Sequence, residues 1–248
     1  MAGRRVWECS LFRSAFSAFR QTHPRYAVVA LNFSLSQYFG DLWSESTLRI
    51  AADGGANRVF DALQHQKNPL LPHYIKGDLD SIRPEVQEYY QSHHEIILQK
   101  DSDQNTTDLQ KCLKLFMTGE IYGHFDEPLI ICGGLGGSLS HTMANIESIV
   151  QYAPKMNNAL YLLSDDNLAC VLEEGSHTIR VAPDMYCAFV PLVSSCYVTH
   201  STNLKYPLDG LELQFGQLVS TSNQCTSEEI TVEVARGPLL FLADSRSG

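Results

Sequence analysis

Five aspartates of this chain stand at positions where carboxylates can share a cation. Asp78 and Asp80 lie two residues apart, directly after a short apolar run, and Asp101, Asp103 and Asp108 follow them. A buried or crowded set of like charges is costly unless a cation neutralises it. Mg²⁺ is held by one or two carboxylates, keeps several waters and takes further ligands from substrate phosphates. The pattern therefore predicts a Mg²⁺-dependent enzyme that handles phosphates.

The Asp-x-Asp pair formed by Asp78 and Asp80 stands at the exit of an expected strand. Side chains two residues apart on a strand point to one face, and in the turn that follows they can converge on one ion. One of the two can instead cap the next helix, because Asp is a favoured N-cap, but capping does not explain both. Asp108 begins an amphipathic run, so capping explains it equally well, and solvation explains Asp101 and Asp103 equally well.

Glycine-rich turns follow two further expected strands. The first reads Asp53-Gly54-Gly55-Ala56-Asn57, and the second runs from residue 133 to 141. Glycines let a backbone approach a ligand closely, and amides at a helix start favour anions, so both turns suit phosphate. For the first turn an ordinary tight turn is an equal alternative. The second is neither a Walker A loop nor Gly-x-Gly-x-x-Gly, and its His141 suits either acid–base chemistry or a helix cap.

The composition restricts the class of protein. The chain has 248 residues, of which 44% are hydrophobic and 19% charged, as in globular proteins that fold in water. A net charge of −10 argues against nucleic-acid binding, which requires a basic face, and no apolar run is long enough to cross a bilayer. The seven cysteines include no Cys-x-x-Cys pair, so we expect buried, reduced thiols rather than zinc ligands or disulfides.

Strand and helix patterns alternate in the first part of the chain. Short apolar runs predict strands at 26–32, 48–53, 74–75, 95–98 and 129–132, and intervening amphipathic runs predict helices at 37–43, up to 63, 83–92, 107–117 and 143–152. This order is typical of a parallel α/β sheet, whose ligands bind at the carboxyl ends of the strands.

After residue 154 the pattern changes to short strands separated by turn residues. These are expected at 159–163, 170–172, 177–181, 186–191, 196–200, 217–220 and 230–234, and they predict a small antiparallel sandwich or barrel. We therefore expect an α/β domain over 1–155 and a β-sandwich domain over 156–248.

The first 23 residues are rich in arginine and contain a single acid, Glu8. Such a composition resembles a mitochondrial transit peptide. The favoured alternative is a folded, amphipathic lead-in whose apolar residues pack on the domain: Val6, Trp7, Leu11, Phe12, Phe16 and Phe19. We accordingly expect a cytoplasmic protein, with mitochondrial targeting as the second interpretation.

Taken in order, these motifs resemble the eukaryotic type of thiamin pyrophosphokinase. The resemblance extends from about residue 26 to 242 and is carried by residues 52–58, 77–86, 103–113, 133–135, 204–206 and 218–223. It implies an N-terminal α/β catalytic domain, a C-terminal β-sandwich and a homodimer with thiamin in a cleft between the subunits. It also implies transfer of a diphosphate from ATP to the thiamin hydroxyl, which gives thiamin diphosphate and AMP.

The resemblance also assigns residues to roles. The expected catalytic and Mg²⁺-binding acids are Asp78, Asp80 and Asp108. The expected contacts to ATP and its phosphates are Asp53, Gly54, Asn57, Gln104 and Gly134. The expected contacts to thiamin are Ser220, Ser222 and Asn223.

The chain departs from the family pattern in its second glycine-rich turn. The family reads Gly-Arg-x-Asp there, whereas this chain has Ser138 and Ser140 in place of the Arg and Asp, and Asn105 replaces a further family Asp. Lys76 is a candidate to supply the missing positive charge. Two other functions therefore stay open: a non-catalytic homologue that binds thiamin or nucleotide, and another Mg²⁺-dependent kinase or nucleotidyl transferase.

Overall fold

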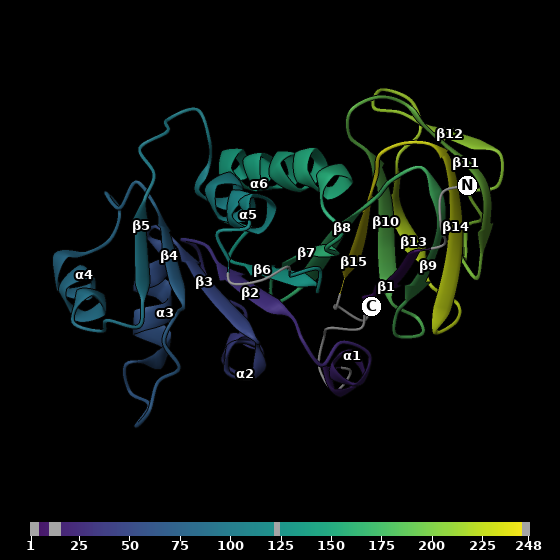
Figure 1. Cartoon of the computed structure of the whole chain (residues 1–248). Coiled ribbons are helices and arrows are strands. Elements are labelled where there is room, and N and C mark those ends of the chain that lie inside the picture. Colours follow the sequence, from purple (N-terminus) through teal and green to yellow (C-terminus); the bar gives the residue numbers. More distant parts are fainter. Residues whose placement is uncertain (1–4, 10–15, 122–124, 245–248) are drawn as a thin grey trace. The chain divides into compact units, whose positions relative to one another are not determined.

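The computed structural model describes residues 5–9, 16–121 and 125–244, and these form two compact units (Figure 1). One unit comprises residues 23–165, and the other combines the described residues before 23 with those from 166 onward. These bounds differ from the predicted 1–155 and 156–248. The strand β7 (Leu160–Leu163) pairs in parallel with β6 (Leu129–Cys132), and β1 (Arg5–Glu8) pairs with β9 (Gly175–Arg180).

The unit of residues 23–165 is built on a parallel sheet, as predicted. Its strands lie in the order β7, β6, β2, β3, β4 and β5. The strands not yet located are β2 (Ala27–Ala30), β3 (Leu48–Ala52), β4 (Tyr74–Gly77) and β5 (Ile97–Lys100). Every residue of β2, β6 and β7 is buried, because helices cover both faces of a parallel sheet.

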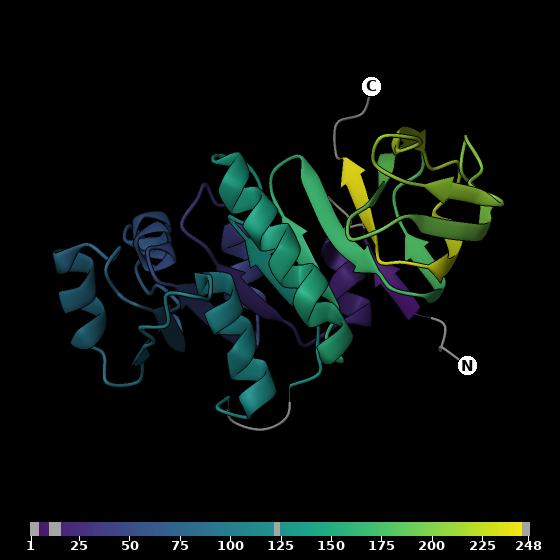
Figure 2. The same cartoon turned by 90° about the horizontal axis from the view of Figure 1, so that it is seen from above.

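The helices of this unit are distributed over the two faces of the sheet. Helices α5 (Asp108–Thr118) and α6 (Leu139–Tyr152) lie side by side on one face, and α2 (Phe39–Glu45) and α3 (Gly55–Leu63) lie on the other (Figures 1 and 2). Helix α4 (Pro84–Gln91) follows β4 and packs near α3, and a 3₁₀ turn spans Ala153–Lys155. The strands stay parallel, but their order changes direction between β2 and β6: β3, β4 and β5 follow on one side of this pair and β7 on the other, and parallel sheets bind ligands at such a point.

Local sequence explains where the helix α5 begins and ends. Thr107 and Gln110 form a reciprocal capping box at its start, and Gly119 ends it in a left-handed conformation with φ of 72°. The amphipathic pattern predicted over 107–117 is confirmed at Leu109, Cys112 and Leu113, which are buried, while Phe116 is half-buried. Helix α6 begins at Leu139, four residues before the predicted start at 143. The prediction missed this first turn because residues 139–141 are exposed and do not continue the apolar pattern of the helix.

The second unit consists of two sheets that are antiparallel apart from the β1–β9 pair. One has the order β1, β9, β14, β11, β12, and the other contains β13, β10, β15 and β8 in that order. The strands not yet located are β8 (Asn167–Leu172), β10 (Tyr186–Pro191), β11 (Cys196–Thr202), β12 (Leu211–Leu213), β13 (Ser220–Gln224), β14 (Glu229–Arg236) and β15 (Leu239–Asp244). Cys9, which follows β1, interacts with Cys170 of β8 in the other sheet.

Residues 5–9 and 16–22 are folded parts of this second unit. Trp7 is buried, and its Nε1 donates a hydrogen bond of 3.0 Å to His177 Nδ1 on the neighbouring strand β9. Helix α1 (Phe16–Thr22) follows, with Phe19 buried. The predicted packing is confirmed for Trp7 and Phe19 and is wrong for Val6, which is 44% exposed because neighbouring side chains of a strand point to opposite faces and Trp7 takes the buried one. Leu11, Phe12 and the side chain of Phe16 lie outside the described residues.

Two absences predicted from sequence are matched in the described residues. All seven cysteines are buried, and none of them forms a disulfide. None of the described helices has the length and apolar character needed to span a bilayer.

Candidate active site

Loops at the carboxyl ends of β2, β4, β5 and β6 surround a pocket of ≈ 380 Å³. Among its lining residues are four of the predicted site or loop residues: Asp78, Gln104, Asp108 and His141. Because all of these loops belong to one parallel sheet, the pocket lies at the edge where sequence reasoning placed the ligands.

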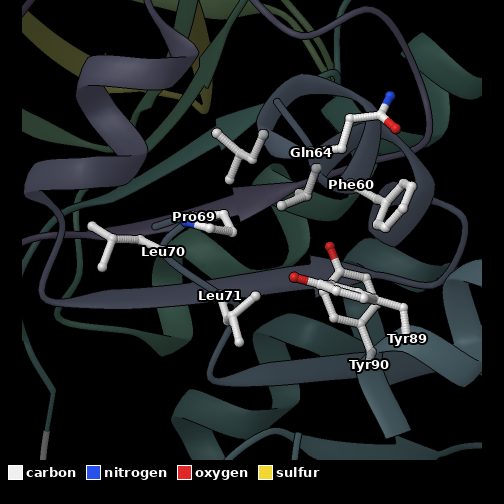
Figure 3. Close-up of a pocket in the computed structure, with 9 residues that line it drawn as sticks. Phe60, Gln64, Pro69, Leu70, Leu71, Tyr89 and Tyr90 are labelled. Carbon is white, nitrogen blue, oxygen red and sulfur yellow. The ribbon is translucent and has the colours of Figure 1, made fainter. Parts of the chain in front are cut away.

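A second pocket in the same unit offers no such chemistry (Figure 3). It lies between Phe60 of α3, the segment around Leu70 and the rings of Tyr89 and Tyr90 on α4. Its volume is ≈ 10 Å³, which is about the space needed for a single water molecule.

Three carboxylates meet beside the larger pocket. One oxygen from each of Asp53, Asp78 and Asp80 lies within 4.8 Å of the other two. Within the described part of the chain, Asp108 does not belong to this group. The Asp-x-Asp pair thus converges as predicted, but its third partner is Asp53, which the resemblance assigned to the phosphates.

Asp53 is the buried member of the group. It follows β3 directly, with an exposed fraction of 1% and a φ of 44°, which is uncommon for a residue other than glycine. Burial raises its pKa, and the negative charges of Asp78 and Asp80 raise it further. Hydrogen bonds from Ser81 and Gly54 lower the pKa in part, and the net shift is upward. Its buried Oδ1 has no hydrogen-bond partner among the described residues, so this oxygen is available to a cation.

Asp78 is held as an ionised carboxylate. Burial alone would raise its pKa, but hydrogen bonds from the Asp80 backbone and the Gln104 side chain, with the charge of Lys111, lower the pKa below its usual value. The distances are 3.3 Å from Asp80 N to Asp78 Oδ1 and 3.2 Å from Gln104 Nε2 to Asp78 Oδ2. Between the two acids, Leu79 has a φ of 65°, a strained conformation of the kind found at functional sites.

Asp108 lies on the other side of Lys111. Lys111 Nζ is 3.5 Å from Asp108 Oδ1 and 3.9 Å from Asp78 Oδ2. Burial raises the pKa of Asp108, as do the charges of Asp53 and Asp78, while Lys111 lowers it. The ammonium group of Lys111 therefore stands between two of the predicted Mg²⁺ ligands.

The sequence did not single out Lys111 as the cation of the site. It suggested Lys76, whose side chain pairs with a different acid. Lys76 is buried, and its Nζ lies 3.8 Å from Asp101 Oδ2. Lys111 lines the pocket, whereas Lys76 is absent from its lining. Asp108 and Lys111 are three residues apart on one helix and therefore lie on the same side of it. This spacing is the sequence signal by which the lysine could have been found.

Two of the predicted phosphate contacts serve other partners. Asn57 donates from Nδ2 to Ser81 O at 2.8 Å and accepts from Arg83 N at 3.0 Å, so it fixes the loop that carries Asp80. Gly55 begins α3 so close to β2 that a Cβ there would overlap with the carbonyl oxygen of Ala30. The glycines of this turn are therefore required by packing, and Gly54 is absent from the pocket lining.

The second glycine-rich turn borders the pocket through Gly133, Gly136 and Ser138. Gly134 itself is buried, and its carbonyl oxygen accepts a hydrogen bond of 2.9 Å from Asn145 Nδ2; it does not line the pocket. The hydroxyl oxygens of Ser138 and Ser140 lie 2.8 Å apart and bond to each other. The turn therefore presents two neutral hydroxyl groups at the positions where the family pattern has Arg and Asp.

The residues predicted to contact thiamin lie on β13 of the second unit. Ser222 is exposed and Ser220 half-buried, but Asn223 has an exposed fraction of only 1%. Asn223 accepts a hydrogen bond from Tyr206 N at 3.1 Å and donates one to Tyr206 O at 2.7 Å. It thus holds the segment around Tyr206, whose ring is exposed.

Comparison with known proteins identifies the family. A model described as the catalytic domain of thiamin pyrophosphokinase matches residues 39–162, and one described as its vitamin B1 binding domain matches residues 176–239. The chain belongs to the thiamin pyrophosphokinase family. The resemblance inferred from the motifs is thereby confirmed, and the boundary between the two matches falls between β7 and β9.

Named relatives cover most of the chain. Thiamine pyrophosphokinase 1 of rice (Oryza sativa subsp. japonica) is 37% identical over 222 residues, 84% of this chain and 83% of that protein. Thiamine pyrophosphokinase 1 of Arabidopsis thaliana is 34% identical over 92% of this chain and 89% of that protein. The solved structure of thiamin pyrophosphokinase from Candida albicans has a TM-score of 0.83 at 17% identity, covering 97% and 92% of the chains, and so shares the fold.

Proposed function

We propose that this protein is a Mg²⁺-dependent thiamin diphosphokinase, which transfers a diphosphate from ATP to the thiamin hydroxyl and releases AMP. The observation that carries the proposal is the unpartnered, buried Oδ1 of Asp53 beside Asp78 and Asp80. In a member of this family, at the carboxyl edge of a parallel sheet, such a group is best explained as a site for the cation that accompanies ATP.

The donor set fits Mg²⁺. Carboxylate oxygens are the ligands this hard cation prefers, and Asp53, Asp78 and Asp80 supply them from two neighbouring strand ends. When bound, Mg²⁺ would neutralise charge on the phosphate oxygens of ATP. Asp108 remains the predicted further ligand, although Lys111 holds its carboxylate in this structure.

The chain's own residues would position the reacting groups. Diphosphoryl transfer depends mainly on orientation and charge neutralisation. Gln104 orients Asp78, and Asn57 fixes the loop that carries Asp80. Lys111 places a positive charge at the pocket wall, where the family's glycine-loop arginine is missing.

The thiamin site is proposed to include the exposed part of β13, at Ser220 and Ser222, with Asn223 supporting it from the buried side. We further propose that the protein is a homodimer with thiamin bound between subunits, as the family resemblance implies. A cytoplasmic location is part of the proposal, because seven buried, unpaired thiols suit a reducing compartment.

The direct test is to incubate the purified protein with ATP, Mg²⁺ and thiamin and to identify products by mass. We expect thiamin diphosphate and AMP, no product in the Asp78→Asn variant, and an unchanged circular dichroism spectrum for that variant. Thiamin monophosphate with ADP would point to a different kinase. Full turnover by Asp78→Asn would contradict the assignment of the site.

The relatives named as thiamine pyrophosphokinases do not favour the alternative of binding without catalysis, which the two serines of the second glycine-rich turn had left open. Ser138 and Ser140 bond to each other and supply no charge to the pocket. The double variant Ser138→Arg with Ser140→Asp tests this possibility. A gain of turnover from none to a measurable rate would establish that the natural chain binds without reacting, whereas comparable rates for both would show that the serines are tolerated.

A further inference from the structure

Lys111 is a buried cation within an acidic site. Its side chain has an exposed fraction of 2%, and it belongs to the buried face of α5. Its Nζ lies 3.5 Å from Asp108 Oδ1 and 3.9 Å from Asp78 Oδ2. Water is largely excluded from Lys111, whereas the side chains of Asp78 and Asp108 are 20% and 40% exposed, so solvent screens the charge of the lysine only in part.

The position of Lys111 sets up a competition. Asp78 contributes to the three-carboxylate group, and Asp108, outside that group, is the further Mg²⁺ ligand proposed above. An ammonium and a divalent cation that share these oxygens also repel each other. A free Mg²⁺ ion that enters the site must therefore act against a fixed positive charge that already partly neutralises the acids.

Nucleotide phosphates change this balance. Their oxygens give the ammonium group new anionic partners at the pocket wall, which Lys111 already lines. The carboxylates are then released to the metal, and the added negative charge offsets the repulsion between the two cations.

We propose that Lys111 is a positioning residue that keeps the site from binding free Mg²⁺ tightly and couples metal binding to the phosphates of the nucleotide. The ligand class is a divalent cation presented with a nucleoside triphosphate. This inference rests on the proposed function, because it requires that Mg²⁺ and ATP bind at Asp78.

The test is a calorimetric titration with MgCl₂, in the absence and presence of a non-hydrolysable ATP analogue. Lys111→Met removes the charge and keeps the length of the side chain, and Lys111→Arg keeps the charge. Lys114→Met is the matched control, because Lys114 lies one turn further along α5 and pairs with Asp103 at 3.5 Å, with 38% of its side chain exposed.

We expect Lys111→Met to bind free Mg²⁺ about tenfold more tightly than wild type or more, since one opposing charge is removed. The analogue should then enhance Mg²⁺ affinity much less in Lys111→Met than in wild type. Lys111→Arg and Lys114→Met should behave like wild type in both titrations.

The outcomes separate this inference from the proposed function. Wild type that binds no Mg²⁺ even with the analogue would overturn both. Wild type that binds Mg²⁺ with the analogue, beside a Lys111→Met variant with unchanged or weaker affinity for free Mg²⁺, would overturn the coupling role alone. If Lys111→Met does not fold without metal, its refolding at free Mg²⁺ concentrations too low to bind wild type supports the coupling role. A folded Lys111→Gln variant with the Mg²⁺ affinity of wild type overturns that role.

Discussion

A Cβ atom on residue 77 would lie 2.5 Å from the Cβ of Asp53, so Gly77 and Asp53 pack backbone against side chain. No side chain fits between the last residue of β4 and the buried carboxylate that follows β3. The glycine before the Asp-x-Asp pair is thus needed to place Asp53 within reach of Asp78 and Asp80.

Gly77→Ala should displace Asp53 and reduce turnover. We expect a loss of about 10–100-fold in Mg²⁺-dependent activity, as for other residues that support metal ligands, and about 1–3 kcal/mol of stability from overpacking. Steady-state kinetics over a range of Mg²⁺ concentrations and urea unfolding measure the two effects. An active, stable Gly77→Ala protein would show that Asp53 can move without consequence.

Asp53→Asn should stabilise the metal-free protein while it removes turnover. Burial raises the pKa of Asp53 in the folded state. Ionisation of this group therefore destabilises the folded protein once the pH exceeds the pKa that the group has in the unfolded chain. At acid pH the carboxyl is neutral in both states and the cost vanishes. We expect the variant to gain about 1–2 kcal/mol at neutral pH and less under acid conditions, measured by urea unfolding at both pH values.

Asn223→Ala and Ser222→Ala should separate stability from substrate binding on β13. The buried Asn223 amide bonds to both backbone groups of Tyr206, so its loss should cost about 1–3 kcal/mol by leaving those groups unpaired. The exposed Ser222 should leave stability unchanged and raise the KM for thiamin more than that for ATP. Thermal unfolding and kinetics with each substrate varied in turn provide the test; an equally stable Asn223→Ala would refute the structural role.

Thr107→Ala should weaken the start of α5, the helix that carries Asp108 and Lys111. Thr107 Oγ1 accepts a hydrogen bond of 3.2 Å from Gln110 N, and loss of such a cap costs about 1 kcal/mol. Thr118→Ala, at the other end of the same helix, is the control and should change stability little. Thermal unfolding of both variants gives the comparison, and equal stability of the two would argue against the cap.

The sequence was sufficient to predict those features that depend on short apolar runs. The residues of β2 and β6 are apolar throughout, and their burial follows from that pattern. The pair Asp78 and Asp80 is close along the chain, so their convergence was predictable. The strands β1, β12 and β15 were missed. Half of the residues of β1 are charged and β12 has only 3 residues, whereas β15 (LLFLAD) is an apolar run that the pattern should have revealed.

The rest of the site depends on contacts between distant segments. Asp53 joins the three-carboxylate group because β3 and β4 are neighbours in the sheet. No local sequence pattern distinguishes its carboxylate from one in an ordinary turn. Lys111 was missed because a lysine on an amphipathic helix is normally assigned to the solvent side. Asn57 and Asn223 bond to backbone groups that no local pattern indicated, and their contacts to phosphate and thiamin stay predictions.

The register between β3 and β4 gives the site one more property. Ala52 is paired with Lys76, and Asp53 N donates to Lys76 O at 2.9 Å, so the ladder fixes how far Asp53 stands from Asp78. A slip by one residue would turn these side chains to opposite faces and separate the carboxylates. During refolding, recovery of Mg²⁺ binding with ATP would therefore count the molecules whose central strands are correctly aligned, even while other parts of the chain are still incompletely folded.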